Sequence, residues 1–193
     1  MSPSTIVSEL KTHQAVLEKT VEQSAQVIGQ ITDAIIQCFQ QGNKLMICGN
    51  GGSAADAQHV AGEFVNRFRY DHAALPAIAL TTDTSVLTCI GNDSDFDFIF
   101  SRQVEALGKP GDILVGISTS GGSANILKAL EAARQLGLTT IGFTGEIGRK
   151  KMGTKCDLCL VVPSADTPRI QESHIFVLHV ICGVVERKIF PQR

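Results

Sequence analysis

The sequence predicts a doubly wound α/β fold, in which helices cover both faces of a five-stranded parallel sheet. Short apolar runs alternate along the chain with longer segments of helical periodicity, which is the order of elements that builds such a sheet. The runs are apolar at consecutive positions, as expected of strands that are buried on both faces. The five predicted strands occupy residues 44–48, 77–80, 113–117, 139–143 and 158–162.

The first 41 residues precede the first predicted strand and are expected to form two amphipathic helices. Apolar residues recur there at helical spacing, as at Ile6 and Leu10 and later at Ile31 and Ile35. Because no strand precedes these helices, they cannot connect two strands of the sheet. Their apolar stripes must cover the sheet or contact another subunit, and we therefore expect an oligomer.

The remainder, residues 42–193, is expected to form the α/β core followed by one long helix. That helix is predicted from about residue 169 to residue 189 and is apolar on most sides, so we expect it to be buried. At roughly 150 residues per domain, a chain of 193 residues predicts one domain. We therefore expect a single domain over residues 1–193, with residues 1–41 used in packing or oligomerisation.

Composition and charge exclude several classes of protein. Hydrophobic residues make up 44% of the chain and charged residues 19%, a balance that excludes a disordered or fibrous protein. The formal charge of -2 gives no overall basic field, so we expect no nucleic-acid partner. The longest apolar stretch, residues 175–185, contains His179 and is shorter than the roughly 20 residues of a membrane span. The N-terminal segment shows no secretory pattern, and we expect a cytoplasmic protein without a membrane partner.

The six cysteines lie mostly inside apolar segments, which indicates reduced, buried thiols and not a disulfide framework. Cys156 and Cys159 form a C-x-x-C pattern without a second pair. Their segment is predicted to be a strand, in which residues three apart face opposite sides of the sheet. This disfavours metal or redox use, and we expect both to be packing residues.

Two turns rich in small residues follow predicted strands, at the edge where an α/β sheet binds its ligands. The first is GNGGSA at residues 49–54, and the second is STSGGS at residues 118–123. Each leads directly into a predicted helix, whose N-terminal N–H groups can bind an anion. The first turn also fits the dinucleotide pattern G-x-G-x-x-A with Asp83 as the ribose acid. Its spacing to Asp83 is near thirty residues, whereas about twenty is usual, so this alternative is weak.

The second turn predicts a binding site for a sugar monophosphate. Its four hydroxyls and two glycines offer many hydrogen-bond donors, and the turn contains no lysine or other base. Nucleoside triphosphates usually need the lysine of G-x-x-x-x-G-K-[ST], which residues 116–123 lack. The alternative interpretation is a turn that only caps a helix at Ser123, which accounts for one or two of the hydroxyls.

Two segments carry side chains suited to ion binding or proton transfer. His59 and Glu63 lie four residues apart on the helix after the first turn, so they share one face and can bind one ion or one substrate. The long C-terminal helix adds Gln171, His174 and His179 to an apolar surface, where polar groups need partners. The alternatives are a surface contact for the first pair and a satisfied core histidine for His179.

Four motifs occur in order along the chain, within a match of nearly full length: CGNGGSAADAQHVAGE at residues 48–63, GND at 91–93, GISTSGGSAN at 116–125 and RIQESH at 169–174. Together they resemble the bacterial phosphoheptose isomerase family, which has the sugar isomerase (SIS) fold. The resemblance implies a cytoplasmic homotetramer that converts sedoheptulose 7-phosphate into D-glycero-D-manno-heptose 7-phosphate. This aldose–ketose isomerisation opens ADP- or GDP-heptose biosynthesis for lipopolysaccharide and other glycans. The chain departs from the family pattern at Gly122, where many members have Asn, and at residues 165–168.

The same resemblance implies roles for individual residues. The phosphate would be held by Ser118, Thr119, Ser120 and Ser123. The sugar would be bound by Asn50, Gly51, Gly52, Ser53, Asn92, Asp93 and Gln171, with Arg67 reaching a neighbouring subunit's site. One zinc ion per subunit would be held by His59, Glu63, Gln171 and His179.

Glu63 and His179 are residue types suited to moving a carbonyl from C2 to C1, which needs a base beside the carbonyl and an acid at its oxygen. Our hypothesis takes Glu63 as the base and His179 as the acid, with the two roles open to exchange. A metal or Asp93 would stabilise the enediol as negative charge develops on oxygen.

Two other functions are compatible with the fold. One is a tetrameric SIS-fold adaptor that binds the replication initiator protein, but such a protein lacks the helix carboxylate that Glu63 supplies here. The other is an isomerase or sensor for a different sugar phosphate, because phosphate loops alone do not define the sugar.

Overall fold

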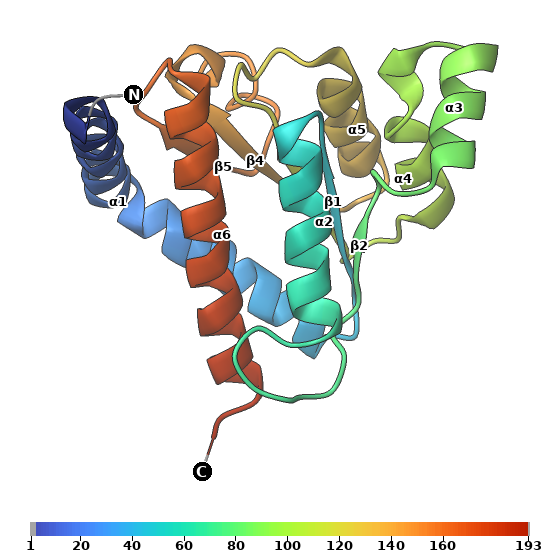
Figure 1. Ribbon diagram of the computed structural model, residues 1–193. Helices are drawn as coiled ribbons and strands as arrows, with labels where there is room; N and C mark the ends of the chain where they lie inside the picture. Colours follow the sequence, from blue (N-terminus) through green and yellow to red (C-terminus); the bar gives the residue numbers. More distant parts are fainter. Residues whose placement is uncertain (1–2, 193) are drawn as a thin grey trace.

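The computed structural model describes residues 3–192 and confirms the five-stranded parallel sheet. The strands lie in the order β2-β1-β3-β4-β5, and every neighbouring pair is parallel (Figure 1). Both ends of β1 and the end of β2 differ from the prediction by one residue, and β4 runs two residues further than expected. The strands are β1 (Leu45–Gly49), β2 (Ala77–Ala79), β3 (Ile113–Ile117), β4 (Thr139–Gly145) and β5 (Leu158–Val162).

Helices cover both faces of the sheet, as a doubly wound fold requires. Leu45 and Ile47 of β1 point into a core shared with one helical layer, whereas Met46 and Cys48 point into the core on the other face. The first layer consists of α1 (Pro3–Gln40), α2 (Gly52–Val65) and α6 (Thr167–Ile189). The second contains α4 (Ser101–Leu107) and α5 (Ala124–Gln135), and α3 (Thr84–Asp93) stands beside it with the 3-10 turn η1 (Phe96–Phe98).

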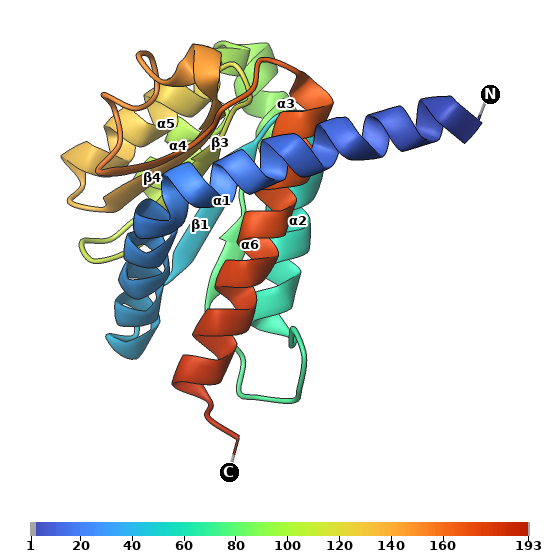
Figure 2. The same cartoon turned by 90° about the vertical axis from the view of Figure 1, so that its left-hand side faces the viewer.

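The predicted pair of N-terminal helices is wrong, because α1 is a single helix of 38 residues. It bends part-way along its length, so the two predicted helices correspond to its two arms (Figure 2). No proline or turn cluster interrupts the segment. Gly29 lies in its interior, and the Thr32 hydroxyl bonds the Ile28 carbonyl at 2.7 Å, a pairing that often accompanies bends.

The two arms of α1 differ in what they cover. Ile31 and Ile35 of the second arm are buried against the sheet. In the first arm, Ile6 and Leu10 remain 60% and 52% exposed. Within residues 3–192, these two apolar side chains are therefore left largely uncovered, and the oligomer stays a prediction.

The predicted C-terminal helix is confirmed as α6, which begins two residues earlier than expected. Pro168 stands in its first turn, where a missing N–H costs nothing. The expectation that α6 is buried is only partly right, because Phe176 and Val180 are each 40% exposed. No helix between residues 3 and 192 is long and apolar enough to cross a membrane.

All six cysteines are free, as expected of reduced thiols. The predicted opposite orientation of Cys156 and Cys159 is wrong, because β5 begins only at Leu158 and Cys156 lies in the bend before it. Both sulfurs therefore lie against Gly142, at 2.7 Å and 3.1 Å from the position that a Cβ atom would take there.

Asp112 ties together the segments at the N-terminal ends of β1 and β3. Its carboxylate accepts hydrogen bonds from the backbone N–H of Lys44 at 3.0 Å and of Lys109 at 2.9 Å, and it pairs with the Lys44 ammonium. Burial raises the pKa of Asp112, but these bonds outweigh burial and leave the pKa below its usual value. The stabilisation is therefore present at neutral pH and is lost as the pH falls through the lowered pKa.

We predict that Asp112→Ala lowers the free energy of unfolding by about 3 kcal/mol, because it leaves two N–H groups and an ammonium without their acceptor. Urea unfolding at fixed protein concentration measures the change. Asp33→Ala, on an exposed face of α1, is the control and should stay within about 0.5 kcal/mol of the parent. Equal stability of the two variants would refute the role given to Asp112.

Candidate functional site

The two predicted ligand-binding turns meet at the centre of the sheet. Gly49 at the end of β1 pairs with Ile117 at the end of β3. From there the chain enters α2 on one face and α5 on the other, which opens a crevice at the carboxyl ends of the two strands. We call residues 49–53 the glycine loop and residues 118–123 the serine loop.

A reciprocal pair of amides joins the two segments. Asn50 Nδ2 donates to Asn125 Oδ1 at 2.9 Å, and Asn125 Nδ2 donates to Asn50 Oδ1 at 3.0 Å. Asn125 is only 3% exposed, so this pair is shielded from water. The sequence motif contained Asn125, but its role depends on a partner 75 positions away and was not predicted.

The glycine loop is shaped by glycines that other residues cannot replace. Gly51 has φ of +56°, a conformation that favours glycine. A Cβ atom on Gly52 would lie 2.5 Å from Nε2 of Gln171, so the amide of Gln171 on α6 occupies that space. The structure thus brings Gln171 to the glycine loop, as the resemblance implied for the sugar site.

The serine loop leaves the N-terminus of α5 open. Ser123 precedes α5, but its side chain does not cap the helix. Its hydroxyl lies 2.9 Å from the hydroxyl of Ser118, and the Ser120 hydroxyl accepts a bond from the Gly122 N–H at 3.3 Å. The interpretation of the loop as a simple helix cap is therefore wrong, and the first N–H groups of α5 keep their capacity to bind an anion.

His59, Glu63 and His179 converge between α2 and α6. The Nε2 atoms of the two histidines are 2.7 Å apart, and His59 Nε2 is 3.4 Å from Glu63 Oε1. The side chain of Glu63 is 20% exposed. Burial lowers the pKa of His179, as does the neighbouring His59, while Glu63 opposes them. The neutral imidazole of His179 is thereby favoured.

This cluster lies some distance from the two loops. Helices α2 and α6 both run away from the loops in the same direction (Figure 1). His59 follows Gly52 by seven residues and His179 follows Gln171 by eight. At the helical rise per residue, the cluster lies roughly 11 Å further along the pair of helices. Within the described part of the chain, no hydrogen bond joins Gln171 to the other three predicted zinc ligands, and its place in a zinc site stays a prediction.

Three other residues of the predicted site lie outside the crevice. Arg67 follows the far end of α2 and pairs there with Asp71. Asn92 and Asp93 end α3, where the Asn92 amide donates to Asp93 at 2.8 Å, and both are exposed. Within residues 3–192, none of the three forms a hydrogen bond or an ion pair with either loop.

Asp56 is a candidate that the sequence interpretation missed. Its Oδ2 atom is buried and has no hydrogen-bond partner among residues 3–192. Burial raises the pKa of Asp56, and the nearby His59 opposes this. The signal in the sequence was its position three residues before His59, which puts both on one face of α2. No group of three or more His, Cys, Asp or Glu in the described chain is already arranged as a metal site.

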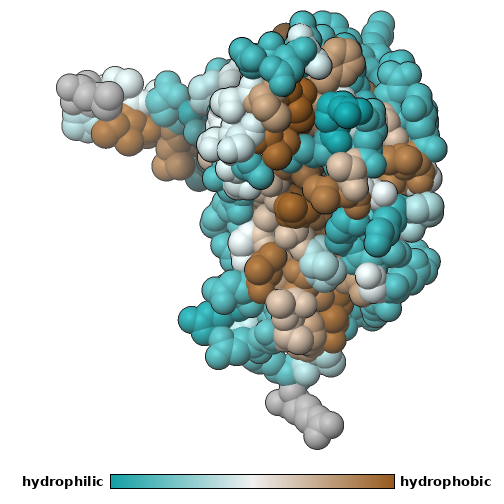
Figure 3. All heavy atoms as spheres, turned by 90° about the vertical axis from the view of Figure 1, so that its right-hand side faces the viewer, coloured by the Kyte–Doolittle hydropathy of each residue, from teal (hydrophilic) through white to brown (hydrophobic). Residues whose placement is uncertain are grey.

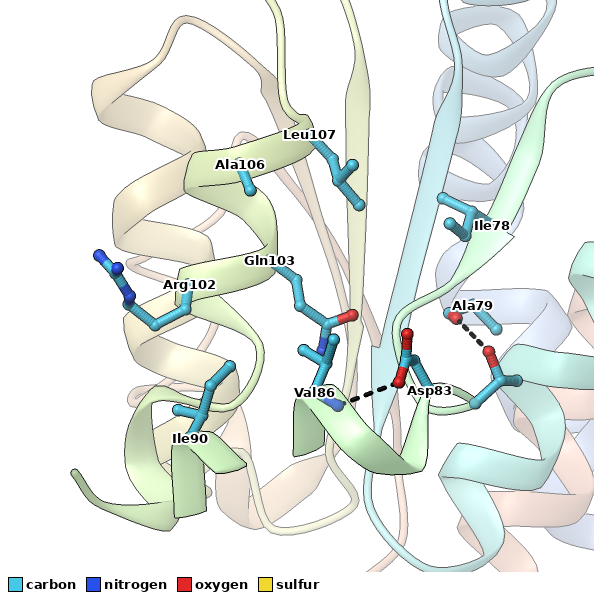
Figure 4. A pocket seen from close by; sticks show the side chains of 10 residues that line it. Ile78, Ala79, Asp83, Val86, Ile90, Arg102, Gln103, Ala106 and Leu107 are labelled. Carbon is cyan, nitrogen blue, oxygen red and sulfur yellow. Dashed lines mark hydrogen bonds between the residues drawn. The ribbon is translucent and has the colours of Figure 1, made fainter. Parts of the chain in front are cut away.

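A separate pocket of about 420 Å³ lies at the β2 edge, between β2, α3 and α4 (Figure 4). Its lining includes Ile78 and Leu107, which are about two-fifths exposed, and apolar surface gathers on this side of the molecule (Figure 3). Asp83 accepts the Val86 N–H at 3.0 Å and caps α3. This cap explains Asp83 without a ribose and removes the support for a dinucleotide site.

The chain is similar to proteins of one kind over nearly its whole length. Residues 10–145 match the SIS domain family. Over 187 residues the chain is 52% identical to the phosphoheptose isomerase of Roseiflexus sp. (strain RS-1), covering 97% of this chain and 94% of that protein. It is 53% identical to that of Trichlorobacter lovleyi, covering 97% and 95%. The solved phosphoheptose isomerase of Neisseria gonorrhoeae has a TM-score of 0.89 at 41% identity, covering 95% of this chain and 97% of that chain.

His174 of α6 is buried against β4, where it contacts Phe143 and Thr144, and its neutral form is favoured. Its ring is fully buried and Nε2 donates to the Thr144 carbonyl at 3.3 Å, whereas Nδ1 has no hydrogen-bond partner in the described part of the chain. Burial lowers the pKa of His174 to about 4, and the bond to Thr144 only partly offsets burial. An unfolded histidine has a pKa near 6.5, so folding stability is complete above that pH and declines as the pH falls toward 4.

We predict that the wild-type chain loses about 3 kcal/mol of stability over this range because His174 resists protonation. His174→Asn should be less stable at pH 7.5 but should show a shallower decline between pH 6.5 and 4.5. Urea unfolding across the pH series measures both slopes. Parallel slopes for the two proteins would show that His174 is not the titrating group.

Proposed function

Because the chain belongs to the phosphoheptose isomerase family of SIS domain proteins, we propose that it interconverts sedoheptulose 7-phosphate and D-glycero-D-manno-heptose 7-phosphate. The activity is that of an aldose–ketose isomerase. The observation that carries the proposal is the His59, Glu63 and His179 cluster, which lies roughly 11 Å along α2 and α6 from the loops, where the N-terminus of α5 is uncapped. The relatives named above are isomerases, and together with Glu63 they favour an enzyme over the adaptor alternative.

The crevice suits a substrate whose reacting carbons lie far from its phosphate. The hydroxyls of the serine loop and the first turn of α5 would hold the phosphate on C7. Roughly 11 Å along α2 and α6, the acid–base cluster would face C1 and C2. The amides of Asn50 and Gln171 lie near the glycine loop, where they would bind hydroxyls of the sugar.

Isomerisation moves one proton between C1 and C2 and another between the two oxygens. We assign the carbon proton to Glu63, a carboxylate held close to His59 and largely shielded from water. We assign the oxygen proton to His179, whose neutral form can accept a proton and return it. Asp56, half-buried on the same face of α2, would favour the charged form of His59.

The donor set also fits a zinc ion, which we include in the proposal. Two imidazole nitrogens face each other at 2.7 Å with a carboxylate oxygen beside them, a mixed N/O set that zinc accepts. His59, Glu63 and His179 would hold the ion, and Gln171 stands two turns away along α6. When bound, zinc would polarise the carbonyl and favour the enediol.

We further propose a cytoplasmic homotetramer. The uncovered stripe of the first arm of α1 supports assembly, since apolar surface of this kind is normally buried by a partner. Assembly would also explain why Arg67, Asn92 and Asp93 lie outside this chain's own crevice, because a neighbouring subunit's site is where they would act. Gel filtration at a mass near 20.6 kDa would refute the oligomer.

We predict that the purified protein converts sedoheptulose 7-phosphate in D2O into an aldose carrying deuterium at C2, seen by proton NMR. Glu63→Gln should lower kcat by 100-fold or more, because general acid–base catalysis contributes about 10² to 10⁴. Glu18→Gln, on the exposed first arm of α1, is the matched control and should leave turnover unchanged. A folded Glu63→Gln variant with wild-type turnover would overturn the assignment of Glu63.

We predict that chelation abolishes turnover and that added zinc restores it. Zinc content before and after chelation, measured by atomic emission, should be one per chain and should fall in His59→Ala and His179→Ala. Turnover that survives complete removal of metal would refute the zinc site and leave the isomerase proposal standing.

A further inference from the structure

The serine loop carries no positively charged side chain to pair with a phosphate dianion. Residues 116–123 contain only neutral donors. Phosphate sites in proteins commonly add a lysine or arginine, because hydrogen bonds between charged partners are about twice as strong as neutral ones. A lysine from a segment far from the loop in the sequence lies beside the loop in the structure.

The turn after β4 lies directly on the serine loop. It begins at η2 (Glu146–Gly148). A Cβ atom on Gly148 would lie 2.8 Å from Gly121 Cα and 2.9 Å from Gly121 N, so the two backbones touch with no side chain between them. Gly121 itself has φ of +61°, which only glycine adopts readily. This contact fixes the position of the residues that follow Gly148.

Lys151 follows in the same turn and reaches over the loop. Its backbone N–H donates to the Gly148 carbonyl at 3.0 Å. Its Nζ atom lies 3.5 Å from the position of a Cβ atom on Gly122, and the Ser120 hydroxyl lies 3.8 Å from the same point. Because Gly122 carries no side chain, nothing on that residue separates the ammonium from the loop.

The ammonium of Lys151 is not engaged by an acidic residue. Within residues 3–192, the lysines in ion pairs are Lys44 and Lys128. Glu146, the acid of the same turn, is bound by Arg149 through two contacts of 2.8 Å. Lys151 is exposed, so its charge is free for a ligand on the serine loop.

We propose that Lys151 is a phosphate-binding residue of this site, and that it supplies the cation that the serine loop lacks. The inference rests on the proposed function, in which the serine loop holds the phosphate of the sugar. It adds a charged contact from the turn after β4 to the neutral contacts of the loop and of α5.

The test compares Lys151→Met with Lys150→Met, which removes the same charge from the neighbouring exposed residue. We expect Lys151→Met to raise KM for sedoheptulose 7-phosphate about tenfold and to leave kcat within about twofold, as loss of uniform binding does. The inhibition constant of inorganic phosphate should rise by a similar factor. Lys151→Arg should retain most of the affinity, and Lys150→Met should resemble the wild type.

Salt provides a readout that a structural role would not move. Raising the salt concentration should raise KM of the wild type more steeply than KM of Lys151→Met, because only the wild type has this charge to screen. Thermal unfolding of each variant checks that the fold is intact.

An unchanged KM and phosphate inhibition constant in Lys151→Met would overturn the inference, as would an equal effect of Lys150→Met. If the wild type does not isomerise sedoheptulose 7-phosphate, the proposed function fails. Calorimetric binding of inorganic phosphate to wild type and Lys151→Met then decides the role of Lys151 separately. Equal affinity of the two for phosphate would refute it.

Discussion

The crevice depends on one pairing in the sheet, that of β1 with β3. Because β1 continues into α2 on one face and β3 into α5 on the other, no connecting helix covers their carboxyl ends. The N-termini of both helices therefore border the same crevice. The reciprocal hydrogen bonds between the amides of Asn50 and Asn125 hold the two segments together. The anion-binding capacity of the site follows from this topology before any side chain is considered.

Helix α6 gives the crevice its second wall and its chemistry. It packs beside α2 and runs in the same direction, so Gln171 meets the glycine loop and His179 meets His59 two turns further on. The same helix buries His174 against β4, in neutral form. One helix therefore serves both ends of the site, and a shift of α6 along α2 would disturb both together.

The fold class and the two loops could be predicted from the sequence because their signals are local. Strands buried on both faces read as continuous apolar runs, and glycine and serine gather where a backbone must approach an anion. The sequence predicted two helices where the structure has the single bent helix α1. No residue within the segment stops the helix, so the chain bends there without ending it. Contacts such as Asn50 with Asn125, or Lys151 with the serine loop, join distant segments and leave no periodic signal. The predicted orientation of Cys156 was wrong for a local reason. Strand β5 begins at Leu158, two residues after Cys156, so the alternation of side chains along a strand does not apply to this thiol.

The contact between Gly121 and Gly148 constrains how this chain can vary. Gly148 stands outside the serine loop, yet a methyl group there would press on Gly121 and on the buried Thr144 hydroxyl, which has no hydrogen-bond partner. A change at position 148 would thus push the serine loop outward, although no atom of that residue binds a ligand. The residues that can be accepted at positions 121 and 148 are therefore linked, although the two positions lie far apart in the sequence. Selection for the shape of the serine loop therefore also acts on Gly148, in the turn after β4.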